Sequence, residues 1–180
     1  MKLLFAVLCL CGVMLAADGP GVWLDVPFVQ QEKDGCGAAS IAMVMQYWQR
    51  QQQKIDVNAD SDPVQIQRAL YSREGHGIYA SDLQHYFQNH GYQTFAFSGN
   101  WDNLQRQLSQ GRPLIVALKT GGHDSEHYVV VAGLQGDHSI VLVNDPEQRK
   151  LLKQDWSTFE KQWSAAAKWT LLVVPQSSPQ

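Results

Sequence analysis

Three side chains are of the types that together turn a thiol into a nucleophile. Cys36 opens the run CGAASIAMVMQYW, His127 opens HYVVVAGL, and Asp145 ends SIVLVND. A cysteine attacks as its thiolate, an imidazole takes up the thiol proton, and a carboxylate fixes the tautomer of that imidazole. If the fold brings them together, these residues predict acyl transfer through a covalent thioester.

The segment that follows Cys36 is predicted to be a buried helix. It is almost wholly apolar, lacks the alternation of a strand, and carries alanine and methionine. Asp34 or a neighbour is expected to cap it, and the small residues after Cys36 would let another element approach. Unpaired N–H groups and the helix dipole favour a thiolate in the first turn. A small buried hydrophobic residue is the alternative, because activation still needs a base.

His127 and Asp145 are predicted to meet at one end of a β-hairpin. Both flanking runs are short, apolar and β-branched, and the polar turn QGDH separates them. Antiparallel pairing through that turn places the start of the first strand beside the end of the second. Asp145 would then accept a proton from one imidazole nitrogen and orient the ring.

Acyl transfer also needs donors for the oxyanion that forms on the attacked carbonyl. The backbone N–H of Cys36, at the start of the helix, is one candidate. A side-chain amide upstream is the other, because an amide donates without titrating. Gln30 and Gln31 are both placed for this role, and spacing alone does not choose between them.

The order of the predicted elements indicates an α+β fold. Helices come first and are followed by strands that can pair as hairpins, so an antiparallel sheet is expected to pack against the helix that begins at Cys36. The remaining predicted helices are 63–71, 81–90, 101–110 and 156–163, and the predicted strands are 92–97, 114–119, 127–134, 139–145 and 169–174.

The first seventeen of the 180 residues have the pattern of a secretory signal peptide. A lysine, a short apolar core and small residues occur in that order. We therefore expect a signal peptide over 1–17, a single domain over 18–175 and a disordered tail over 176–180. The protein would be exported and periplasmic or secreted, with no stable membrane span after cleavage. Cys9 and Cys11 would leave with the signal peptide, so that Cys36 remains as the one thiol.

The charge balance bears on the partners of the domain. The whole chain carries 14 Lys and Arg against 17 Asp and Glu, a net charge of −3. A mildly acidic domain without a basic stripe argues against nucleic acid as a partner. We expect a monomer that acts on a peptide or protein substrate.

A zinc site is the main metal alternative. The segment 123–127 reads HDSEH and matches the H-x-x-E-H pattern. That pattern works on a helix, where both histidines share a face, whereas glycines precede this segment and a strand follows it. We therefore expect no metal and no other cofactor.

The quoted motifs resemble the bacteriocin-processing, double-glycine leader cysteine peptidases, which belong to the papain-like group. The resemblance lies in VPFVQQEKDGCGAAS, HYVVVAGL and VNDP and runs from about Val26 to Val174. It implies a papain-like fold and a cysteine peptidase that hydrolyses peptide bonds. The implied roles are nucleophile for Cys36, general base and acid for His127, and orienting acid for Asp145. It also favours Gln30 as the oxyanion donor, because the family spacing to the cysteine is six.

Two alternatives use the same fold. Papain-like domains can lose activity and bind peptides, but the four catalytic positions are filled in this sequence. An acyl or peptidyl transferase would hand the acyl group to an amine instead of water, and the sequence does not separate this activity from hydrolysis. Many relatives are the N-terminal domain of an exporter and act in the cytoplasm, whereas this protein is expected to be exported. Cleavage of a double-glycine leader therefore does not follow from the motifs.

Overall fold

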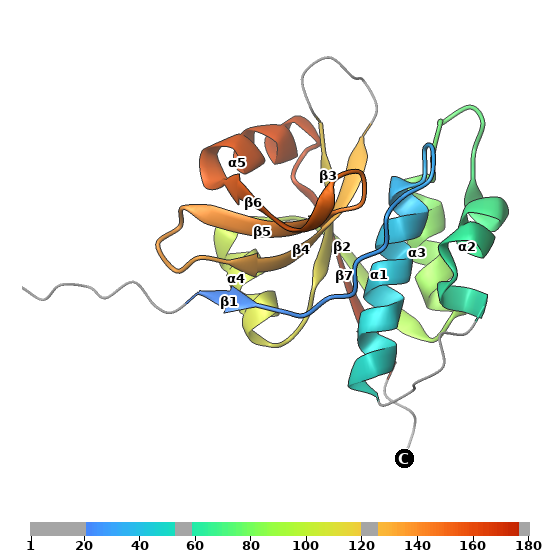
Figure 1. The fold of residues 1–180 in the computed structure, drawn as a ribbon, viewed down its shortest axis with the longest axis horizontal. Helices are drawn as coiled ribbons and strands as arrows, with labels where there is room; N and C mark the ends of the chain where they lie inside the picture. Colours follow the sequence, from blue (N-terminus) through green and yellow to red (C-terminus); the bar gives the residue numbers. More distant parts are fainter. Residues whose placement is uncertain (1–20, 53–58, 120–125, 177–180) are drawn as a thin grey trace, which may run out of the picture.

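A seven-stranded antiparallel sheet forms the centre of the structure (Figure 1). The computed structural model describes residues 21–52, 59–119 and 126–176. The strand order is β2-β7-β3-β4-β5-β6, and β1 adds to β4 beside this path. The strands are β1 (Val22–Trp23), β2 (Tyr92–Ser98), β3 (Leu114–Leu118), β4 (His127–Leu134), β5 (Ile140–Asp145), β6 (Arg149–Asp155) and β7 (Trp169–Pro175).

Helices cover both faces of this sheet (Figure 1). On one face lie α1 (Cys36–Gln51), α2 (Pro63–Leu70) and α3 (Ala80–Asn89), with a short 3₁₀ turn at Ala59–Ser61 between α1 and α2. On the other face lie α4 (Trp101–Ser109) and α5 (Trp156–Ala165). The predicted α+β fold, with the helix from Cys36 packed on an antiparallel sheet, is confirmed.

Burial on both faces explains the unbroken apolar run of β4. Tyr128, Val130 and Ala132 belong to the core under α1. Val129 and Val131 alternate with them and belong to the core under α4 and α5. A strand covered on both sides needs apolar residues at every position, so its sequence loses the usual polar alternation.

The helix α1 is buried along most of its length, as its composition predicts. The hydroxyl of Ser40 donates to the carbonyl of Tyr128 at 3.3 Å and ties α1 to β4. Gly37 allows a second close approach, since a Cβ built on it would lie 3.0 Å from the Cβ of Ile78. The small residues after Cys36 therefore hold the helix against both the sheet and the segment that precedes α3.

At the N-terminus of α1, a neighbour of Asp34 and not Asp34 itself occupies the N-cap position. The N-cap residue is Gly35, and no side chain caps the helix. Asp34 instead adopts a left-handed conformation with φ of 57°. Its carboxylate accepts a hydrogen bond of 3.3 Å from the hydroxyl of Tyr71, so it binds a neighbouring segment and not the helix end.

Two strands, β1 and β6, were not predicted from the sequence. β6 is an edge strand that carries several charged residues, which are common where a strand has one unpaired side.

The predicted signal peptide lies outside the described residues, as do residues 177–180 of the predicted tail. The first residue of that tail, Gln176, is described, and its N–H donates to the carbonyl of Gly91 at 2.9 Å. Among the helices that the structure describes, none is both long and apolar enough to cross a membrane.

Candidate active site

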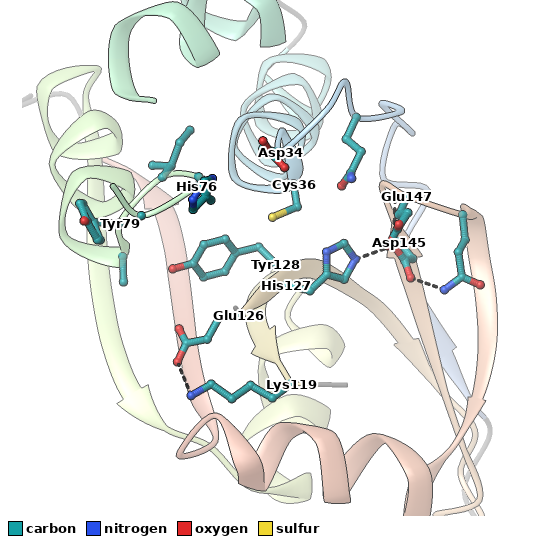
Figure 2. A pocket seen from close by; sticks show the side chains of 16 residues that line it. Asp34, Cys36, His76, Tyr79, Lys119, Glu126, His127, Tyr128, Asp145 and Glu147 are labelled. Atoms are coloured by element: carbon teal, nitrogen blue, oxygen red, sulfur yellow. Dashed lines mark hydrogen bonds and ion pairs between the residues drawn. The ribbon is translucent and has the colours of Figure 1, made fainter. Parts of the chain in front are cut away.

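An open cleft of about 650 Å³ lies between the N-terminus of α1 and the adjoining ends of β4 and β5 (Figure 2). Cys36 enters it from α1, His127 from the first position of β4, and Asp145 from the last position of β5. The opposite wall comes from the segment 75–80, which packs on α1 through Ile78. The helix α1 and the strands β4 and β5 thus bring the predicted reactive groups to one cleft.

The hairpin of β4 and β5 brings His127 and Asp145 into direct contact. Val130 pairs with Asn144 in an antiparallel ladder, so the start of β4 and the end of β5 lie at the same end of the two strands. Nε2 of His127 donates to Oδ1 of Asp145 at 2.8 Å. This leaves Nδ1 of the ring as the nitrogen available to a thiol.

Two further groups hold the carboxylate of Asp145. The N–H of Glu147 donates to Oδ1 at 3.0 Å, and the side-chain amide of Gln148 donates to Oδ2 at 2.6 Å. Both oxygens are therefore fixed, and the carboxylate cannot rotate freely away from the imidazole. Sequence analysis did not identify Gln148, because a glutamine in a polar turn carries no signal of its own.

The sulfur of Cys36 points into the cleft, towards the space between the Tyr128 ring and the His127 imidazole (Figure 2). Burial lowers the pKa of His127, but hydrogen bonds with Asp145 and Cys36, and the charges of both groups, outweigh burial and raise the pKa to about 10. The ring is therefore an imidazolium at neutral pH. A cation in this place stabilises a thiolate beside it.

The pKa of Asp145 shifts in the direction that keeps it ionised. Burial acts to raise the pKa of this carboxyl, but the hydrogen bond and charge of His127, with the donors Glu147 and Gln148, lower it overall. Burial also raises the pKa of the Tyr128 hydroxyl, so this group stays neutral in the cleft. The site thus combines a fixed carboxylate, an imidazolium and a neutral phenol.

The end of β5 and the turn after it also hold the segment leading into α1. Asn144 is fully buried, and its amide donates to the carbonyl of Val26 at 3.2 Å. The carbonyl of Pro146 accepts a hydrogen bond of 2.9 Å from the N–H of Gln31. Asp145, between these two anchors, is therefore placed relative to the nucleophile by backbone contacts as well as by the sheet.

The structure separates the two candidate oxyanion donors. Gln31 lines the cleft with Cys36, and its side-chain oxygen is buried without a hydrogen-bond partner among the described residues. Gln30 is exposed and borders a small neighbouring pocket instead of the cleft. The first α1 hydrogen bond runs from the N–H of Ala39 to Gly35, so the N–H of Cys36 has no acceptor within the helix.

The segment that matched the zinc pattern is only partly described. His123 lies outside the described residues. Glu126 forms an ion pair of 3.7 Å with Lys119, and His127 is bonded to Asp145. Within the described parts of the chain, no group of three or more histidine, cysteine, aspartate or glutamate side chains is placed to hold a metal ion.

Comparison with known proteins identifies the family. Residues 23–170 match the Peptidase_C39 like family, and the chain belongs to this family. None of the curated proteins matches the chain at a significant level.

Several solved structures share the fold. A double glycine motif protease from an AMS/PCAT transporter, in complex with the leader peptide, is 22% identical, with a TM-score of 0.66 over 86% of this chain and 95% of its own. A C39-like protein from Bacillus anthracis is 20% identical, with a TM-score of 0.68 over 89% and 100%. The peptidase domain of Streptococcus ComA, a bi-functional ABC transporter, is 18% identical, with a TM-score of 0.66 over 84% and 98%. These similarities establish a C39-like, papain-like fold.

The charge of His127 gives a testable titration. Its folded pKa lies above the ordinary 6.5, so its contribution to stability is complete below about pH 6.5 and is lost as the pH rises towards about 10. NMR of the labelled ring should show the imidazolium persisting well above pH 6.5. The variant Cys36→Ala removes a hydrogen bond and a charge that raise this pKa, so the ring should titrate at lower pH. A wild-type ring that deprotonates near pH 6.5 would contradict the ion pair.

Proposed function

We propose that this protein is an exported cysteine peptidase that hydrolyses peptide bonds through a thioester intermediate. The observation that carries the proposal is the convergence of Cys36 and the bonded pair of His127 and Asp145 in one open cleft. The family supports the reaction class, since its members include peptidases with this fold. In this proposal Cys36 is the nucleophile, His127 the general base and acid, and Asp145 the orienting group.

In the acylation step the thiolate of Cys36 attacks the scissile carbonyl carbon, and a C–S bond forms. The carbonyl π electrons move to oxygen, which becomes an oxyanion. Collapse of this intermediate breaks the C–N bond, and the imidazolium of His127 gives its proton to the leaving amine. Asp145 keeps the imidazole in place during this transfer. The carboxylate itself is held because the N–H of Glu147 and the amide of Gln148 donate to its two oxygens.

In the deacylation step water attacks the thioester, and the now neutral imidazole of His127 takes the water proton. The C–S bond breaks, the thiolate returns, and the carboxylic acid product leaves. The N–H groups at the start of α1 and the helix dipole favour a negatively charged sulfur at this position. The same groups therefore serve both halves of the cycle.

We assign the side-chain oxyanion donor to Gln31 in place of Gln30. Gln30 is exposed and does not line the cleft, whereas Gln31 lines it. The bond from Gln31 N–H to the carbonyl of Pro146 fixes the backbone from which this amide extends. With the N–H of Cys36, the amide would supply two donors to the oxyanion.

A peptide is the expected substrate class. The AMS/PCAT relative was solved with its leader peptide, which supports a peptide in the corresponding cleft of this chain. The signal-peptide pattern of residues 1–17 supports a reaction outside the cytoplasm, in the periplasm or the medium. The substrate would therefore be an exported or extracellular polypeptide.

A peptide-library digest tests the activity itself. Wild-type protein should cut a subset of peptides, and Cys36→Ala should cut none, because no other group in the cleft can form the thioester. Mass spectrometry of the products identifies the cut positions. Circular dichroism of Cys36→Ala serves as the folding control. Equal cleavage by the wild type and Cys36→Ala, or no cleavage by either, would overturn the proposal.

The two neighbouring glutamines provide a matched pair of variants. Gln31→Leu should lower kcat by about 10²- to 10³-fold, the usual loss when one oxyanion donor is removed. Gln30→Leu makes the same change one residue away and should leave kcat within about twofold, because an exposed side chain outside the site contributes little. The kinetic measurement uses the best peptide from the library. The reverse result would return the role to Gln30.

A further inference from the structure

A second hollow adjoins the cleft at Asp34. It is open, has a volume of about 530 Å³, and is lined by Lys33, Asp34, Gln67, Arg68, Tyr71 and Arg73. Asp34 lines both this hollow and the cleft, and it stands beside Cys36 in Figure 2. A ligand that extends out of the cleft past Asp34 would therefore enter this second hollow.

The lining of the hollow is dominated by positive charge. It carries the side chains of Lys33, Arg68 and Arg73 against the single carboxylate of Asp34. None of these three cations forms an ion pair or a side-chain hydrogen bond within the described residues. In a chain with a net charge of −3, three cations that are unpaired within the described residues surround one hollow and form a local field opposite in sign to that of the whole protein.

Hydrogen bonds fix the backbone that presents these cations. The side-chain amide of Gln67 donates to the carbonyl of Asp34 at 3.4 Å, and the hydroxyl of Tyr71 donates to its carboxylate at 3.3 Å. The turn that carries Lys33 and the C-terminal end of α2 that carries Arg68 are thereby joined. The phenol ring of Tyr71, 36% exposed, remains available as an apolar surface in the hollow.

We propose that this hollow, formed by Lys33, Arg68, Tyr71 and Arg73, is an exosite for an acidic segment of the peptide substrate. Guanidinium groups bind carboxylates through paired, charge-assisted hydrogen bonds, and two of the three cations are arginines. The exosite selects substrates whose acidic residues lie on the Asp34 side of the scissile bond. This role rests on the proposed peptidase function. The chemistry occurs only in the neighbouring cleft.

Direct binding tests the exosite without any cleavage. The probe is a fluorescein-labelled hexaglutamate peptide, compared with a hexaglutamine peptide by fluorescence anisotropy on the full-length Cys36→Ala protein. The acidic peptide should bind, the neutral one should not, and the affinity should fall as salt is raised. The triple variant Lys33→Gln, Arg68→Gln, Arg73→Gln should weaken binding by about tenfold or more, because the carboxylates lose their charged donors.

A second triple variant controls for net charge. Arg106→Gln, Lys153→Gln and Lys161→Gln remove three cations from α4, β6 and α5, on other parts of the molecule. This variant should bind the acidic peptide as the parent does. Equal weakening by both triple variants would show a nonspecific effect of net charge and would overturn the exosite, as would the absence of binding to the parent at low salt.

Cleavage kinetics link the exosite to the reaction. The best library peptide is extended at either end by three glutamates or three glutamines. One glutamate extension should lower KM severalfold in the wild type with kcat unchanged, and the exosite variant should lose this difference while still cutting the glutamine peptide. Equal KM values for the glutamate and glutamine extensions at both ends would overturn the exosite alone. Failure to cut any peptide would defeat the peptidase proposal, whereas the anisotropy result would still decide whether the acidic segment binds.

Discussion

The hydrogen bond between His127 and Asp145 is the interaction on which the site depends. It exists because β4 and β5 pair antiparallel with Val130 opposite Asn144, which brings the start of β4 and the end of β5 together at one end of the two strands. β4 contributes to the cores on both faces of the sheet and β5 to the core under α4 and α5, so a slip of one residue would turn the buried side chains of a strand to the opposite face. The hydrophobic core therefore helps to fix the positions of the two polar groups, together with their hydrogen bond.

The second constraint is the position of the thiol relative to this pair. Cys36 belongs to a helix that is buried against β4, and the segment before it is tied to the end of β5 through Asn144 and to the following turn through Pro146. One turn thus orients the acid and anchors the approach to the nucleophile. This arrangement gives a physical reason for a buried asparagine next to the aspartate: its amide satisfies carbonyls of the approaching segment that the sheet does not pair.

The sequence predicted the parts of the structure that depend on local pattern. The apolar run after Cys36 and the β-branched run after His127 each specify one element, and the short turn between two strands specifies their pairing. Contacts made by polar turn residues could not be predicted. Of two consecutive residues in an irregular segment, such as Gln30 and Gln31, only one lines the cleft, and spacing alone does not show which one. The charged edge strand β6 was missed because its stability comes from pairing with β5 and not from its own composition.

The most direct test of the account is the rate at which iodoacetamide alkylates Cys36 at about pH 6, measured against free cysteine. The proposed mechanism requires the imidazolium of His127 to activate the sulfur beside it, so Cys36 should react faster than the free amino acid. The variant His127→Gln should remove this advantage while the protein stays folded. If Cys36 in the wild type reacts no faster than free cysteine, the sulfur and the ring do not form the ion pair, and the proposed mechanism fails.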